Sequence, residues 1–390
     1  GALPNGKAVI VNADGTVSVV AGANTGLGSD TEFNPSGNSS HVSSTYDSTN
    51  NKIVVVEGDS SNGQAFVGTV SGSSITFGAG ATIDSSETEI LNVVFDTSNN
   101  KIVVAYKDGG DGDKVKARVG TVSGTSISFG TIVEVANQGG DGNMTFDSNA
   151  NKVLITYSYG NAAYAVVGTV SGTSISFGSI ATTVSAQAPT WGQAFDSNSN
   201  KHLITYRDND GSSFGSKVAT ISGTSVSFGS EASLGQNPQG IKGAAVFDPD
   251  NNKFVVFYAD RGNSGYGTAR VGTISGTSIS YGTAVVFASS VPNYIGASYD
   301  TANNKIVMAY QISGGVNQVQ TATVSGTSIT FADDAIAITS TTISHFANGL
   351  TYDPDQGKTV IAYKDEGQDS DGYAKVYTVG STNLTSENYI

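Results

Sequence analysis

The feature that most constrains this chain is an internal repeat with a period of about fifty residues. An aromatic residue and an aspartate, followed by a turn and a lysine, occur seven times, as "YDSTNNK", "FDTSNNK", "FDSNANK", "FDSNSNK", "FDPDNNK", "YDTANNK" and "YDPDQGK". The aspartates, spaced 49 to 53 residues apart, are Asp47, Asp96, Asp147, Asp196, Asp248, Asp300 and Asp353. A fixed period of this length indicates a repeat architecture in which each unit packs against its neighbours.

Each unit carries four strand signals. In residues 90–130, "ILNVVFD" is a short apolar run, "KIVVAYKD" is rich in β-branched and aromatic residues, "KVKARVGTVSG" alternates, and "SISFG" closes the unit. No helical apolar stripe with a cap and a stop persists anywhere in the chain. Seven such units predict an all-β fold, a seven-bladed β-propeller of four-stranded blades.

The last unit lacks a "TSISFG" segment of its own. The N-terminal "GTVSVVAG", residues 15–22, has the character of the missing strand, which predicts that the N-terminus completes the last blade and closes the ring. Residues 7–13, with Asp14-Gly15 as a hairpin turn, would add a strand outside it. The prediction therefore assigns residues 1–22 to a closing N-terminal hairpin and residues 23–380 to the propeller.

Charge and composition exclude several classes of protein. The 19 basic and 33 acidic residues give a net charge of -14, which disfavours binding to nucleic acid and to anionic membrane surfaces. The chain has no cysteine, so it has no disulfide, no thiolate metal site and no cysteine nucleophile. Because no run approaches the roughly 20 apolar residues of a membrane-spanning helix, we expect no membrane insertion.

Comparison of the copies within the chain separates two faces of the predicted ring. The turns after the first strand (DxxNNK) and after the third strand (SGTS) fall on one face, here called the turn face, and they are almost identical from unit to unit. The loops after the second strand and the links between blades fall on the opposite face, here called the link face, and they differ in length and chemistry. We therefore expect the function to lie on the link face.

The links contain aromatic residues and histidines that are candidates for a binding surface. Exposed aromatic side chains beside polar groups are typical of sugar-binding and protein-docking surfaces. The alternative is that these aromatic residues pack over the ring and cap its channel. The binding-face candidates are His41, Trp191, Tyr294, His345 and Phe346.

The loops after the second strands are acidic and rich in glycine. Closely spaced carboxylates could supply the oxygen ligands that Ca²⁺ prefers, and no other cofactor is expected. No copy completes an EF-hand loop, and Asp and Gly are also ordinary turn residues, so solvated turns are the alternative. The candidate calcium ligands are Asp108, Asp111, Asp113, Asp208, Asp210, Asp365, Asp369 and Asp371.

The sequence offers no catalytic residues. The three histidines lie in different units, and His202 takes a strand position that most other units fill with an apolar residue, which favours a packing role. One aspartate at the same turn of every unit is a folding device. The alternative to a non-enzymatic protein is a secreted hydrolase or lyase acting on polysaccharide, with carboxylates from distant blades converging at the channel mouth. A lectin with one sugar site per blade would need equivalent links, and "TVSAQAPTW" and "SLGQNPQGIK" are not equivalent.

The repeated unit "FDTSNNKIVVAYKD", followed by "GTVSGTSISFG", resembles repeats of virion structural and tail-fibre proteins of marine tailed phages. The opening "LPNGKAVIVNADGTVSVV" and the closing "NLTSENYI" resemble the segments that flank such repeats, which implies that residues 381–390 begin a further C-terminal region. The resemblance implies an extracellular virion appendage that binds host-surface glycan or another virion protein, as an oligomer within an assembly. It carries over no catalytic or binding residues.

Overall fold

The computed structural model describes most of the chain. The described residues are 9–11, 17–19, 25–35, 39, 41–185, 190–207, 214–235, 243–332, 335–344 and 346–380. Of residues 9–11, 17–19, 190 and 191 only the backbone is described. The expected C-terminal extension, residues 381–390, lies outside this set.

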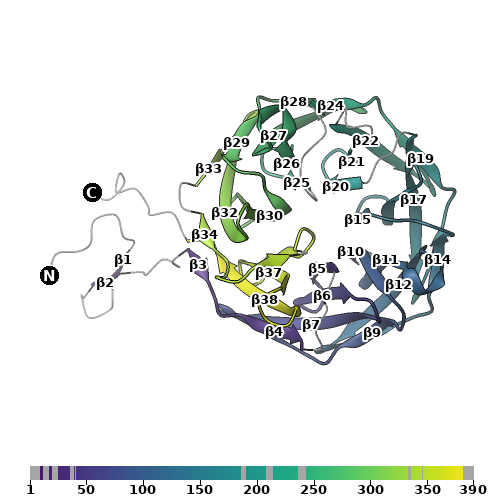
Figure 1. Ribbon diagram of the computed structural model, residues 1–390, viewed down its shortest axis with the longest axis horizontal. Coiled ribbons are helices and arrows are strands. Elements are labelled where there is room, and N and C mark those ends of the chain that lie inside the picture. Colours follow the sequence, from purple (N-terminus) through teal and green to yellow (C-terminus); the bar gives the residue numbers. More distant parts are fainter. Residues whose placement is uncertain are drawn as a thin grey trace.

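Seven antiparallel sheets form the blades of a ring, which confirms the predicted seven-bladed β-propeller (Figure 1). The innermost strands are β5 (His41–Asp47), β10 (Thr88–Asp96), β15 (Gly142–Asp147), β20 (Thr190–Asp196), β25 (Ala244–Asp248), β30 (Asn293–Asp300) and, in two pieces, β35 (Ile343–Ser344) with β36 (Leu350–Asp353). The second strands are β6 (Lys52–Gly58), β11 (Lys101–Asp108), β16 (Lys152–Tyr159), β21 (Lys201–Arg207), β26 (Lys253–Asp260), β31 (Lys305–Ile312) and β37 (Lys358–Asp365). The third strands are β7 (Gly63–Ser71), β12 (Lys114–Ser123), β17 (Ala162–Ser171), β22 (Phe214–Ser222), β27 (Tyr266–Ser275), β32 (Val316–Ser325) and β38 (Asp371–Thr378).

The outer strand of each blade is divided into two short pieces that pair with the same third strand. In the second blade, one piece pairs with the segment Gly120–Ser123 of β12 and the other with Val115–Ala117. The sequence prediction covered only the first piece. Dividing the strand leaves a short and irregular outer edge, which disfavours pairing with another chain. The pairs are β8 (Ser74–Phe77) and β9 (Ala81–Asp84), β13 (Ser126–Phe129) and β14 (Val133–Ala136), β18 (Ser174–Phe177) and β19 (Ala181–Val184), β23 (Ser225–Phe228) and β24 (Ala232–Gly235), β28 (Ser278–Tyr281) and β29 (Val285–Ala288), and β33 (Ser328–Phe331) and β34 (Ile336–Ala337).

The core lies between the blades, and the second strands contribute most to it. Their apolar runs are continuous rather than alternating because both faces of each second strand are covered by neighbouring blades. In β11, Val103, Val104 and Ala105 are fully buried. Side chains of adjacent blades form shared clusters, so each blade depends on its neighbours for burial.

The strand that completes the seventh blade is not the predicted one. The outer partners of β38 are β3 (Gly26–Leu27) and β4 (Thr31–Asn34). Within the predicted segment 15–22, β2 (Val17–Val19) pairs with β1 (Val9–Val11) as a separate hairpin. The assignment of residues 15–22 to the closing strand was therefore wrong by about ten residues.

Phe33 and Gly28 show why residues 26–34 fit this position. The ring of Phe33 contacts those of Phe66 and Phe77 in the first blade, with centroids 5.3 and 5.5 Å apart. A Cβ on Gly28 would lie 1.8 Å from the backbone oxygen of Ser73, so only glycine allows this approach. Residues 26–34 therefore join the last blade to the first.

The glycine that ends "SISFG" has the same role in five other blades. A Cβ on Gly78, Gly130, Gly178, Gly229 or Gly282 would lie about 2 Å from the backbone oxygen of the threonine in the next blade's SGTS turn. The sixth blade has Ala332 instead, and the seventh blade has no SGTS sequence to approach it. The glycine is thus required only where a neighbouring turn packs against it.

The turn face is fixed by local hydrogen bonds. In every unit the aspartate of the DxxNNK turn is buried, and its Oδ1 accepts from the backbone amides of the residues two and three positions later. In the sixth blade Ala302 N and Asn303 N donate to Asp300, both at 3.0 Å. The residue before the lysine is left-handed, as in Asn100 with φ 53°, and glycine replaces asparagine there at Gly357. This pattern confirms that the seven aspartates are folding devices.

Helix is confined, within the described residues, to two 3₁₀ turns, η1 (Gly109–Asp111) and η2 (Arg261–Asn263). In the part of the chain that the structure describes, no helix is long and apolar enough to cross a membrane.

Candidate functional site

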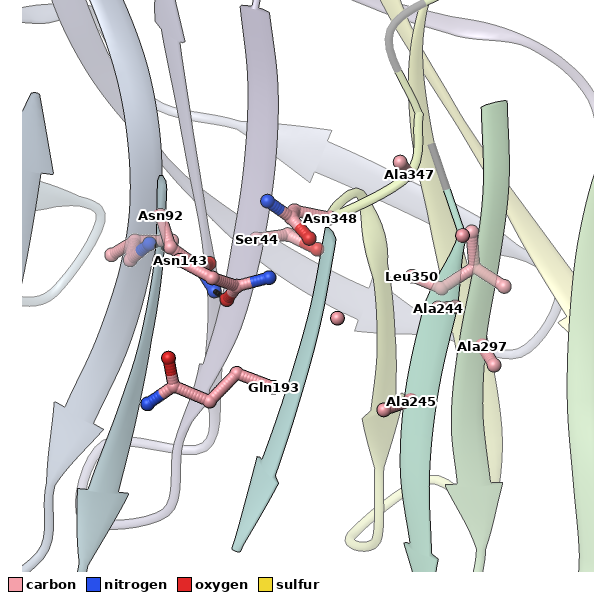
Figure 2. Close-up of a pocket in the computed structure, with 13 residues that line it drawn as sticks. Ser44, Asn92, Asn143, Gln193, Ala244, Ala245, Ala297, Ala347, Asn348 and Leu350 are labelled. Atoms are coloured by element: carbon pink, nitrogen blue, oxygen red, sulfur yellow. Dashed lines mark hydrogen bonds between the residues drawn. The ribbon is translucent and has the colours of Figure 1, made fainter. Parts of the chain in front are cut away.

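A cavity of about 160 Å³, here called the channel pocket, lies at the link-face end of the innermost strands (Figure 2). Its lining comes from all seven blades, three or more residues before the conserved aspartates. The residue types at these positions differ from unit to unit, unlike those of the conserved turns. The channel pocket is therefore individual to this chain rather than a product of the repeat.

One side of the channel pocket carries amides and a hydroxyl from the first four blades and the last. Its polar lining residues are Ser44, Asn92, Asn143, Gln193 and Asn348. Asn92 is fixed at both ends: its Oδ1 accepts from Ser43 Oγ at 2.7 Å, and its Nδ2 donates to Asn143 Oδ1 at 2.5 Å. Asn348 Nδ2 donates to Leu91 O at 3.1 Å, which joins the segment between β35 and β36 of the seventh blade to the second blade. These bonds hold the amides in defined orientations.

The other side of the channel pocket is apolar and small. Ala244, Ala245, Ala297 and Leu350 line it, and Figure 2 shows them opposite Asn92, Asn143 and Gln193. The strands there approach closely, because a Cβ on Gly192 would lie 2.8 Å from the amide nitrogen of Ala245. The innermost strands are therefore crowded at Gly192, where a larger residue would not fit.

No ionisable side chain is among the described residues that line the channel pocket. Acid–base catalysis needs a group that exchanges a proton near the reacting bond, and amides do not titrate in water. An anion would find no Lys or Arg here, and a hard cation would find no carboxylate. What this lining can do is exchange hydrogen bonds with an uncharged polar ligand.

Below the channel pocket, His202 belongs to a buried polar network between the third and fourth blades. It is fully buried; its Nδ1 lies 2.9 Å from Thr145 Oγ1 and its Nε2 3.3 Å from Asp147 Oδ2. Burial lowers the pKa of His202 in spite of the neighbouring Asp147, so the neutral imidazole is favoured. The packing role expected for His202 is confirmed, with specific hydrogen bonds in addition.

The structure distributes the five predicted binding-face residues among different environments. Tyr294 and Phe346 come together, with ring centroids 6.1 Å apart, but Phe346 is fully buried in a core cluster and is not available to a ligand. His41 is half-buried at the start of β5. The side chain of Trp191 and the whole of His345 lie outside the described residues.

The candidate calcium ligands are engaged with protein groups. Asp108 is buried and accepts from Ser86 Oγ at 2.7 Å and Lys116 Nζ at 2.5 Å. Lys116 also lies 2.9 Å from Asp111, and Lys107 lies 3.4 Å from Asp113. These lysines supply the positive charge that an ion would otherwise bring.

Of the remaining candidates that can be placed, Asp365 is engaged with protein groups in the same way, whereas Asp369 and Asp371 differ. Asp365 accepts from Thr341 Oγ1 at 2.8 Å and from Gly367 N at 2.9 Å. Asp369 is exposed with φ 52°. Burial and the neighbouring charge of Asp371 raise the pKa of Glu32, and Asp371 Oδ1 is buried without a hydrogen-bond partner among the described residues. Asp208 and Asp210 lie outside the described residues. Among the residues that the structure does describe, no group of three or more His, Asp or Glu side chains could hold a metal ion.

The turn face carries a second and more apolar hollow. It has a volume of about 420 Å³ and is lined by aromatic residues of the repeated aromatic-Asp pair, namely Tyr46, Phe95, Phe146 and Phe195. These rings also pack within the blades: Phe195 contacts His202, with ring centroids 4.8 Å apart. Their repetition in every unit ties them to the folding of the blades.

Sequence reasoning missed the amides of the channel pocket. Asn92 and Asn143 stand four residues before the conserved aspartate, where the other units have serine, glycine or alanine. Aligning the seven units by that aspartate would have shown which innermost positions depart from the repeat. The aromatic residues and histidines drew attention to the links instead.

The comparisons with known proteins support the fold. No family model and no curated protein matches the sequence. Among solved structures, the chain is similar to a protein from Lactobacillus plantarum, with a TM-score of 0.58 and 10% identity over 85% of this chain and 91% of that one. It is also similar to the β-propeller domain of Cps50 (Swd1) from Myceliophteria thermophila, with a TM-score of 0.55 and 7% identity over 90% and 99% of the two chains.

A third similar structure is the WD40 domain of coronin from Toxoplasma gondii, with a TM-score of 0.55 and 8% identity over 92% of this chain and 87% of that one. At such identities the likeness shows the fold alone. The class that the structure defines is therefore a seven-bladed β-propeller.

Proposed function

We propose that this protein is a non-enzymatic recognition module of an extracellular particle, which attaches through its link face to a cell-surface glycan or to another protein of the particle. The observation that carries the proposal is the contrast between the two faces. The turn face repeats the same hydrogen-bonded turns in every blade, whereas the link-face end of the channel has its own chemistry in each blade. A surface that differs from blade to blade is available for specific recognition.

The chemistry of the channel pocket favours binding over catalysis. A hydrolase or lyase would need convergent carboxylates or another proton-transferring pair, and the described lining consists of amides, a hydroxyl and small apolar residues. Fixed amides beside a smooth apolar wall are suited to holding an uncharged polar group. The alternative of a polysaccharide-cleaving enzyme therefore has no supporting observation among the described residues.

The resemblance of the repeats to tail-fibre and virion structural proteins of marine tailed phages leads us to propose a virion appendage as the particle. The net charge of -14 disfavours attachment through anionic lipid, and leaves uncharged glycan and protein as partners.

The experiment is a binding assay with the full chain. A fluorescent conjugate is applied to intact marine bacteria and to an array of surface glycans, with and without EDTA. Saturable binding to cells or to a defined set of glycans supports the proposal. No binding to any cell or glycan, together with turnover of a polysaccharide, would replace it with the enzymatic alternative.

A further inference from the structure

The inference concerns the ligand of the channel pocket, and it rests on the proposed recognition function. The observation behind it is that two side-chain amides of the channel pocket, Asn143 and Asn348, each have one polar atom engaged in hydrogen bonds and the other atom open. Asn143 Oδ1 accepts from Asn92 Nδ2 at 2.5 Å and from the backbone amide of Met144 at 2.8 Å. These two donors identify the oxygen of the Asn143 amide and direct its Nδ2 toward the channel pocket (Figure 2).

Asn143 is 5% exposed, and within the described part of the chain its Nδ2 has no acceptor. On the same polar side of the channel pocket, Asn348 Nδ2 is engaged with Leu91 O, and Asn348 Oδ1 accepts from none of the described groups. The channel pocket thus presents one donor and one acceptor with fixed positions. A ligand or an ordered water in the channel pocket can form hydrogen bonds with both of these atoms.

The size and the asymmetry of the channel pocket limit what can occupy it. At about 160 Å³ it is comparable to engineered cavities of roughly 150 Å³ that hold one small ring. It is below the roughly 300 Å³ of pockets that enclose drug-sized ligands. One small ring, or the terminal unit of a longer chain, is the largest occupant it can hold.

The two walls of the channel pocket match the two kinds of surface on a sugar ring. The amide wall can bond to hydroxyl groups, and the wall of Ala244, Ala245 and Ala297 can accept the face of C–H groups. The absence of ionisable groups from the described lining disfavours sialic acids, uronic acids and phosphates. We infer that the channel pocket binds the terminal residue of an uncharged glycan, with Asn143 Nδ2 donating to one hydroxyl and Asn348 Oδ1 accepting from another.

The test uses saturation-transfer NMR and calorimetry with methyl glycosides of neutral hexoses and N-acetylhexosamines, and with glucuronic and sialic acid glycosides. The first variant, Asn143→Asp, keeps the oxygen that Asn92 and Met144 need and removes the donor. We expect binding to weaken about tenfold or more, because one lost hydrogen bond to a sugar hydroxyl is worth about 1.4 kcal/mol.

Because a carboxylate at position 143 is nearly buried and could weaken the fold, a second variant fills the cavity instead. Ala297→Leu places a larger side chain at a position where three of the six other blades have a large apolar residue, namely Val93, Met144 and Leu350. Ser298→Val is the matched control: it changes the next residue of the same strand, lies outside the lining, and introduces the residue found at Val94 and Val246. We expect Ala297→Leu to abolish sugar binding at an unchanged melting temperature and Ser298→Val to leave it intact.

The outcomes separate this inference from the function on which it rests. Neutral sugar binding that Ala297→Leu leaves unchanged, or a preference for the acidic glycosides, would overturn the inference. So would attachment of the full chain to cells in the absence of any binding to neutral sugars, a result that leaves the recognition function standing. Failure of the full chain to attach to any cell or glycan would remove the cell-surface form of the recognition function as well as this inference.

Discussion

Glu57 provides the sharpest test of how the ring closes. In six blades the corresponding position of the second strand is a tyrosine, namely Tyr106, Tyr157, Tyr206, Tyr258, Tyr310 and Tyr363. In the first blade it is Glu57, which is fully buried and whose Oε1 accepts from Asn34 Nδ2 at 2.9 Å. Asn34 belongs to β4, so this hydrogen bond spans the seam between the last blade and the first.

At the boundary between the first and second blades, the acidic residue and its hydrogen-bond partner stand on the opposite strands. There Tyr106 donates its hydroxyl to Asp84 Oδ2 at 2.8 Å, so that the acid lies on the outer strand and not on the second strand. Between the seventh and first blades, the acidic residue is Glu57 on the second strand, and the outer strand carries Asn34 instead. Glu57 Oε2 makes no hydrogen bond of good geometry to any described residue.

The size of the effect of Glu57 on folding stability follows from its pKa. Burial raises this pKa from its ordinary 4.5 to about 7; the charge of Asp59 adds to the rise, and Ser39 and Asn34 reverse only part of it. Below pH 4.5 the carboxyl is protonated in both the folded and the unfolded chain, so it costs nothing. Between pH 4.5 and 7 only the unfolded chain loses the proton, and folding stability falls as the pH rises, by about 3 kcal/mol in total.

The perturbation is Glu57→Gln, which keeps an acceptor for Asn34 and cannot ionise. At about 2.1 cal/mol/K per residue, a chain of 390 residues has an unfolding entropy of roughly 0.8 kcal/mol/K, so about 3 kcal/mol corresponds to about 4 °C. We expect the variant to melt about 4 °C above the wild type at pH 8 and level with it at pH 4.5. The assay is differential scanning calorimetry from pH 4.5 to 8.

Glu134→Gln is the control for this experiment, since the Glu134 side chain is half-exposed and its contact with Lys114 is a surface ion pair. It should shift the melting temperature little at any pH. If Glu57→Gln follows the pH profile of the wild type, the pKa of Glu57 is not raised in the folded protein and the reasoning is wrong.

Three further predictions concern the stability of the propeller. Removal of residues 1–24 should leave the melting temperature almost unchanged, whereas removal of residues 1–35 takes away β3 and β4 and should lower it by several degrees; equal effects would contradict the closure described above. Gly178→Ala should destabilise the protein by about 1 to 3 kcal/mol in calorimetry, because its Cβ would lie 1.9 Å from Thr224 O, whereas Ala332→Gly should cost less than about 1 kcal/mol; a harmless Gly178→Ala would refute the packing argument. Chelation with EDTA should leave the melting temperature unchanged, since Asp108 and Asp111 are neutralised by Lys116, and a fall would reveal a structural ion.

The sequence predicted the blades and their turns well because these parts of the structure are repeated. Seven copies of the aromatic-Asp turn and six of the SGTS turn are enough to fix the number of blades, their strands and the two faces. The closing strand was misplaced because residues 15–22 and 26–34 both suit an extended strand. What distinguishes them is long-range: the approach of Gly28 to Ser73, the packing of Phe33 on Phe66, and the bond from Asn34 to Glu57.

The candidate site was less predictable for a related reason. The amides of the channel pocket become a site only when innermost strands of different blades meet, as in the contact of Asn348 with the second blade, 257 residues away in the chain. Phe346 illustrates the opposite error, since an aromatic residue in a link is exposed or buried according to packing that no local pattern records.

The most direct measurement of the central claim, that recognition belongs to the link face, uses the absence of cysteine from the chain. A single cysteine is introduced at exposed Ser313, between β31 and β32 on the link face, or at exposed Ser197, in a DxxNNK turn on the turn face, and each is coupled to a bulky maleimide polymer. Attachment of the full chain to cells or glycans is then measured. Loss of attachment with the polymer at position 313 and its retention with the polymer at position 197 is the predicted result; the reverse would contradict the account.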